Sequence, residues 1–201
     1  MNAIAKETEM TEEEVIATRG QSILDVPQTA VTHKKGGSMS RRAELLADRI
    51  EEGAAALAAF AEGLSEAEWR APMPGNEKDR RPVGVIVHHV ASVYPIEIDL
   101  ARTIASGKAV TDVTWEVVAE LNAKHAQDQA AVTKADALEL LRQNSREAAA
   151  AVRTFTDDEL DRAAPFSLSF DAPVTAQFVI EDHALRHSWH HLARIRTALG
   201  R

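Results

Sequence analysis

Apolar side chains recur at helical spacing through four long stretches of this chain, and this periodicity constrains its fold more than any other feature. The predicted helices span residues 41–62, 82–106, 136–155 and 173–199. Pro82 stands where proline is favoured in a first turn, and glycine, which commonly ends helices, closes the first, second and fourth stretches. Four long amphipathic helices in 201 residues predict an all-α four-helix bundle.

Smaller signals refine this prediction. Residues 114–130 have the pattern of a short extra helix inside a long connection. Strand signals are nearly absent apart from a brief alternation from Phe166 to Phe170. Pro95 lies inside the second helix, so we expect a kink or a break near Tyr94.

Two segments of the chain resemble each other. Residues 64–72 and 155–165 both begin like a capping box, and each precedes a Pro-Val pair and a long helix that carries histidine. This echo predicts two equivalent helix pairs, with the second and fourth long helices facing each other across the core. Chance similarity in an alanine-rich helical sequence is the alternative.

The first part of the chain differs from the rest. Residues 1–40 carry an acidic run, Glu7 to Glu14, and little apolar periodicity, so we predict a disordered tail before a bundle domain at 41–201. Met39 offers an alternative start for the natural chain.

The composition excludes several function classes. Lys and Arg number 23 against 31 Asp and Glu, a net charge of −8 that makes nucleic acid an unsuitable partner. We find no stretch approaching the roughly 20 apolar residues that span a bilayer and no secretory signal, and therefore expect a cytoplasmic protein without a membrane partner. The chain has no cysteine, so thiol chemistry would need an external thiol.

Histidine is concentrated near the C-terminus, where residues 183–191 hold four of the eight histidines. Side chains four apart on a helix lie on one face, which is a spacing that suits a shared metal ion. The apolar arc of the fourth helix is flanked by His187 and His191, whereas His183 and His190 turn further toward solvent.

The second helix offers a third imidazole. His89 shares its side of the helix with apolar residues, whereas His88 falls on a wetter side. The apolar neighbours placed inward with it are Val85, Ile86, Val93, Ile96 and Leu100. His89, His187 and His191 therefore form a candidate metal site that leaves coordination positions open. The alternative for each ring is a hydrogen-bonded core histidine.

Other histidines and carboxylates have secondary roles in this prediction. We expect His33 and His125 to be solvated, and His183 and His190 to be supporting or surface groups. Three carboxylates are near enough in sequence to orient a ligand or act as a base: Glu97, Glu181 and Asp182.

Two motifs carry a family resemblance. They are Pro82-Val-Gly-Val-Ile-Val-His-His89-Val-Ala and His187-Ser-Trp-His-His191-Leu-Ala-Arg-Ile. On the basis of these two motifs, residues 41–199 resemble the DinB superfamily. Its members are four-helix proteins that include YfiT-like metalloproteins and the mycothiol-dependent maleylpyruvate isomerase type. The resemblance implies a divalent metal, zinc or nickel, on His89, His187 and His191. Where the family often has Gly-Gln, this chain has Ala193-Arg194, so no glutamine role is carried over.

These observations lead to competing functions. The first is a metal-dependent thiol S-transferase or isomerase that uses a small external thiol and an electrophilic substrate, with a hydrolase as a variant. The second is a non-catalytic stress-response or ligand-binding module with a structural metal, and the third is a metal-free family member. The first two allow a homodimer.

Overall fold

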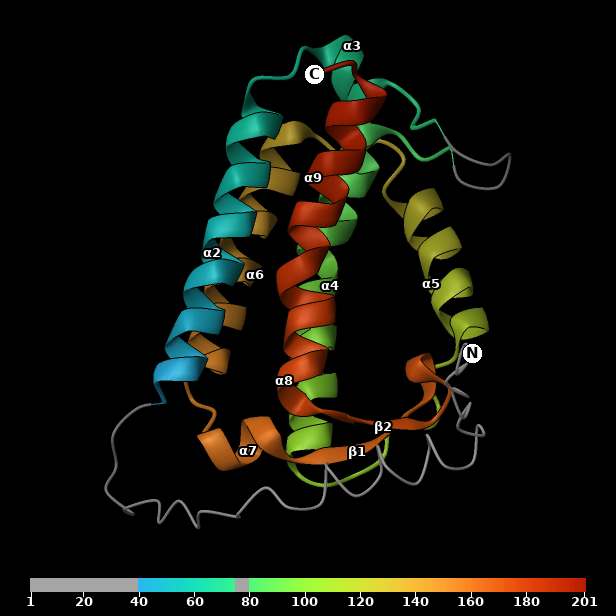
Figure 1. Cartoon of the computed structure of the whole chain (residues 1–201). Helices are drawn as coiled ribbons and strands as arrows, with labels where there is room; N and C mark the ends of the chain where they lie inside the picture. Colours follow the sequence, from blue (N-terminus) through green and yellow to red (C-terminus); the bar gives the residue numbers. More distant parts are fainter. Residues whose placement is uncertain (1–39, 75–79) are drawn as a thin grey trace, which may run out of the picture. The chain divides into compact units, whose positions relative to one another are not determined.

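The computed structural model describes residues 40–74 and 80–201, and its four long helices form the predicted bundle (Figure 1). Three of them are continuous: α2 (Arg41–Glu62), α4 (Val83–Ala105) and α6 (Lys134–Val152). The fourth is built from α8 (Ala176–Val179), the π-helical η2 (Ile180–Leu185) and α9 (Arg186–Ala198). α2 packs against α6 and α9, and α4 packs against α6 and the fourth helix, so each helix borders two others around one apolar core.

The helix starts follow the local sequence. Side chains of Ser40, Thr133 and Thr175 cap α2, α6 and α8 by accepting a backbone N–H of the first turn. The predicted stop at Gly63 is correct in position, although this glycine has φ −77° and is not left-handed. The chain turns there because Ser65 immediately caps the next helix.

The internal echo is present in three dimensions. α3 (Glu66–Arg70) and α7 (Asp157–Asp161) each begin with a complete capping box. After each short helix, a carbonyl accepts the N–H at the start of a long helix, Val83 to Ala71 and Ala176 to Arg162, both at 3.0 Å. The repeat places α4 and the fourth helix in corresponding positions, as the sequence predicted, but the two are direct neighbours in the bundle and do not face each other across the core.

The strand prediction was partly wrong. β1 (Ala163–Phe166) and β2 (Ala172–Thr175) form a two-stranded antiparallel ladder around the 3₁₀ turn η1 (Ser167–Ser169). Phe170 and Asp171 have φ of 56° and 59°, so they reverse the chain where the sequence predicted a strand. Pro173 lies in β2, and the fourth helix therefore begins at Ala176.

Pro95 does not break α4. Proline has no N–H, so the carbonyl four residues earlier, on Ala91, loses its helical partner. The side-chain amide of Asn144 on α6 donates to this carbonyl at 2.8 Å. A hydrogen bond from the neighbouring helix thus replaces the one that Pro95 removes, and α4 continues from Val83 to Ala105.

α4 also corrects the expectation that no stretch is apolar enough to span a bilayer. By length and composition it could cross a membrane, with a mean hydropathy of 1.3 over its best window. In the bundle, 61% of that window is buried. Its central position between α6 and the fourth helix accounts for its apolar composition.

The predicted extra helix is α5 (Trp115–Asp128), which contacts α4 at the side of the bundle (Figure 1). The predicted disordered tail at 1–40 lies outside the described residues except for Ser40.

Candidate metal centre

The structure brings together the three histidines selected from the sequence. One ring nitrogen from each of His89, His187 and His191 lies within 4.8 Å of the other two. The ring centroid of His89 is 5.1 Å from that of His187 and 5.7 Å from that of His191, and the centroids of His187 and His191 are 4.8 Å apart. In the described part of the chain, this is the one such group of three or more histidine or carboxylate side chains. The convergence is observed, whereas metal binding by these residues stays a prediction.

Local helix geometry helps to position His187 and His191 on the fourth helix. Ile180, Ala184 and Ser188 are all buried, although a spacing of four drifts by about 40° per step on a regular α-helix. The wider turn of η2, which ends at Leu185, two residues before His187, reduces this drift. π-Helical turns within α-helices are frequent at functional sites.

A buried hydrogen bond joins the two helices beside the cluster. The hydroxyls of Tyr94 on α4 and Ser188 on α9 lie 2.6 Å apart, and both residues are fully buried. Burial raises the pKa of the Tyr94 phenol above its ordinary value, so it stays protonated. Because Ser188 follows His187 directly, this hydrogen bond fixes the position of His187 along the axis of α4. Sequence reasoning missed this pair, since a Tyr and a Ser 94 residues apart give no local signal.

Glu97 is the second group beside the cluster. Its side chain is 5% exposed, and its Oε1 lies 2.5 Å from Nδ1 of His187. A carboxylate at this position accepts the Nδ1 proton, which fixes the ring and leaves Nε2 for an ion. Oε2 of Glu97 is buried and has no hydrogen-bond partner within the described residues. Glu97 is one of the three carboxylates that the sequence analysis named as candidates, and the structure places it beside the three histidines.

His191 is buried among cationic or potentially cationic neighbours. Burial first, and then the proximity of His187 and His89, lowers the pKa of His191 far below its ordinary value. The ring is therefore neutral and can donate a lone pair. Its Nδ1 is buried and lacks a hydrogen-bond partner among the described side chains and backbone.

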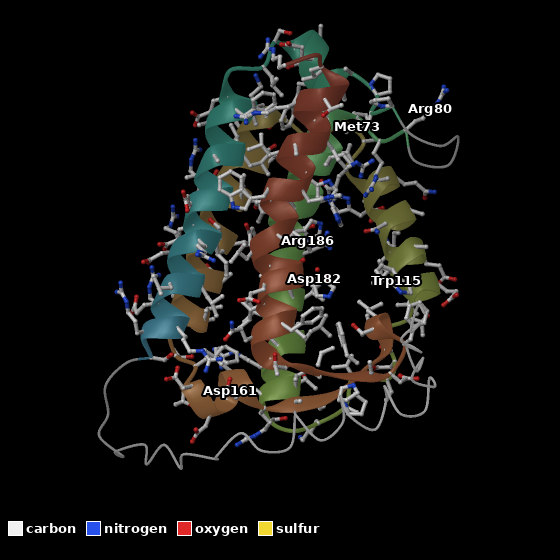
Figure 2. The ribbon with its side chains drawn as sticks, viewed as in Figure 1. Met73, Arg80, Trp115, Asp161, Asp182 and Arg186 are labelled. Atoms are coloured by element: carbon white, nitrogen blue, oxygen red, sulfur yellow. The ribbon has the colours of Figure 1, made fainter. Side chains whose placement is uncertain are left out.

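The other two carboxylates lie elsewhere. Asp182 pairs with Arg186 at 2.9 Å, and Figure 2 shows the two together along the fourth helix. Glu181 accepts a hydrogen bond from Gln177 on the same helix at 2.8 Å. Neither contacts the three clustered histidines through a described hydrogen bond.

Several predicted orientations were wrong. Ile96, placed inward from the sequence, is 51% exposed, and Glu97 is buried in its stead. α4 is apolar on most of its surface, so periodicity alone could not fix which face meets the core. His183 does not turn to solvent but packs edge-on against Phe166, with ring centroids 5.5 Å apart, and burial lowers its pKa.

His125 also departs from expectation. Predicted to be solvated, it is half-buried, and its Nε2 lies 2.8 Å from Nδ1 of His88. His190 is exposed, as predicted, and His33 lies outside the described residues.

Comparisons with known proteins extend these observations. A family model described as the DinB superfamily matches residues 18–195. Among solved structures, the chain is similar to YfiT from Bacillus subtilis, described as a probable metal-dependent hydrolase with an unusual four-helix bundle topology. The TM-score is 0.61 at 20% sequence identity, over 84% of this chain and 94% of YfiT, which is a similarity of fold. No curated protein matches the sequence.

Proposed function

The chain belongs to the DinB superfamily. From this premise we propose that it is a divalent-metal enzyme that adds an external low-molecular-weight thiol to an electrophilic substrate, or uses that thiol to isomerise the substrate. The observation that carries the proposal is the group of three imidazoles from two helices, with no fourth protein ligand among the described residues. Three protein ligands are the number typical of catalytic zinc sites, whereas structural sites have four.

The residues fit such an ion. Imidazole nitrogen is a favoured ligand of zinc, nickel and copper, and the buried, unpartnered Nδ1 of His191 is a polar atom that an ion or its water would satisfy. When bound, a divalent cation lowers the pKa of a coordinated thiol or water and so provides a nucleophile at neutral pH. The absence of cysteine agrees with a thiol supplied by a cosubstrate.

The chain's own residues perform the positioning. Glu97 accepts the proton of His187 Nδ1 and thereby selects the tautomer whose Nε2 keeps a lone pair for an ion. Tyr94 and Ser188 hold α4 and α9 in register, which keeps His89 opposite His187 and His191. The apolar core around these helices keeps the pKa of His191 low, so its lone pair is available at neutral pH.

A hydrolase is the second candidate, and one observation favours it. Oε2 of Glu97 is buried and unpartnered within the described part of the chain, next to the clustered rings. A carboxylate oxygen in that position is suited to accept a proton from water during hydrolysis. The description of YfiT as a probable metal-dependent hydrolase supports the same alternative.

The two activities separate in one experiment. The untagged protein is stripped by chelation, reloaded with zinc or nickel, and assayed for consumption of a small thiol with an activated haloarene, and for ester hydrolysis without thiol. The His187→Ala/His191→Ala variant should lose the metal-dependent rate, whereas His190→Ala, which removes an exposed histidine of the same helix, should keep it.

Each result decides between the candidates. Metal-dependent thiol consumption supports the transferase, and ester hydrolysis alone supports the hydrolase. Metal binding that raises the unfolding temperature without either activity supports a structural or ligand-binding role. Equal rates in the double variant and the unsubstituted protein would refute a catalytic role for the cluster.

A further inference from the structure

A second pair of histidines adjoins the cluster. His88 Nδ1 on α4 and His125 Nε2 on α5 lie 2.8 Å apart, and their ring centroids are 5.1 Å apart. The ring of His125 also meets His89 edge-on, at a centroid distance of 5.6 Å. Imidazoles from two helices therefore continue from the three-histidine group to the side of the bundle where α5 lies (Figure 1).

The way α5 meets the bundle is unusual for a packed helix. The half-buried residues of α5 are Val118, Asn122, His125 and Ala126, of which two are polar. The large apolar side chains of Trp115 and Leu121 are 53% and 55% exposed. No residue of α5 is buried, although the whole helix lies within the described residues. Burial of apolar surface, which normally holds a helix in place, contributes little here.

The contact between the two rings suits a cation. Two nitrogens bound to one zinc ion at about 2.0–2.1 Å with tetrahedral angles lie about 3.3 Å apart. The nitrogens of His88 and His125 need to separate by only about half an ångström to reach that distance from 2.8 Å.

We propose that His88 and His125 form a second divalent-cation site, adjacent to the three-histidine site and distinct from it, whose ion fastens α5 to α4. The site takes a borderline cation such as zinc, since both protein ligands are imidazoles. With two protein ligands in place of three, it binds more weakly than the first site. The proposal goes beyond the proposed function and does not depend on it.

Zinc titration of the full-length, chelator-stripped protein tests this site, with calorimetry to count equivalents. The unsubstituted protein should bind two equivalents, His125→Gln and His88→Gln one each, and His187→Ala/His191→Ala one. His190→Ala removes an exposed histidine that belongs to neither site and should leave the count at two. Because α5 contributes no buried residue, His125→Gln should leave the far-ultraviolet circular dichroism of the bundle intact.

Hydrogen exchange reports the fastening of α5 itself. Amides of residues 115–128 should exchange at least several-fold more slowly once the second equivalent binds, and this protection should be absent in His125→Gln. The proposal is overturned if no bound equivalent depends on His88 and His125, if the second equivalent persists in His125→Gln, or if zinc leaves α5 exchange unchanged. A single equivalent that depends on His88 and His125, with none that depends on His187 and His191, would instead contradict the proposed function.

Discussion

Replacing Glu97 by Gln tests how the buried carboxylate contributes to the metal centre. The amide oxygen of Gln can still accept the Nδ1 proton of His187, so the variant keeps the shape of the contact and removes its charge. The contact is 2.5 Å long and the carboxylate side chain is 5% exposed, so solvent screens it little. Loss of such a partner to a ligating histidine lowers metal affinity about 10–100-fold, equivalent to about 1.4–2.7 kcal/mol.

The assay is competition for zinc against a chromophoric chelator of known affinity. Glu181→Gln is the matched control, because it removes an exposed carboxylate that contacts Gln177 on the same helix. We expect the control to retain the affinity of the unsubstituted protein and Glu97→Gln to lose at least tenfold. Equal affinities in the two variants would show that Glu97 does not act on a ligand of the ion.

Three further predictions concern the protein without metal. Asn144→Ala leaves the Ala91 carbonyl beside Pro95 without its donor and should lower the free energy of unfolding by about 1–3 kcal/mol in urea titrations; an unchanged midpoint would contradict this role. Gly84→Ala would place a methyl group against the buried Trp69 indole and should lower the free energy of unfolding by about 1–3 kcal/mol, measured by thermal denaturation. Ala54→Gly, at another buried helical site, tests the effect of glycine alone. Burial lowers the pKa of His191 in the folded state, so below the ordinary imidazole pKa of 6.5 the unfolded state binds more protons than the folded state. The free energy of unfolding should therefore fall with decreasing pH by about 1.4 kcal/mol per unit from this group. The pH slope between 6 and 5 should be smaller in His191→Phe, and an identical slope would refute the assignment.

The sequence predicted those parts of the fold that depend on neighbours along the chain. The capping boxes at Ser65 and Thr156 and the extent of α2 follow from residues within one or two helical turns. The turn at Phe170 and Asp171 escaped prediction because neither is the glycine that usually adopts positive φ.

Contacts between distant segments were harder to predict. The three histidines His89, His187 and His191 converge as predicted because helical spacing orders side chains on each helix, and because α4 packs against the fourth helix. Glu97 could not be separated from other carboxylates, since its partner His187 is 90 residues away. His125 was misjudged for the same reason, because its partner His88 belongs to another helix.

The central claim is that one divalent cation binds among His89, His187 and His191. Anomalous diffraction at the zinc edge, from crystals of untagged protein loaded with one equivalent of zinc, measures the position of the ion directly. The account predicts a peak about 2.0–2.1 Å from one nitrogen of each ring. Zinc found only at other residues, with no peak between these three imidazoles, would contradict it.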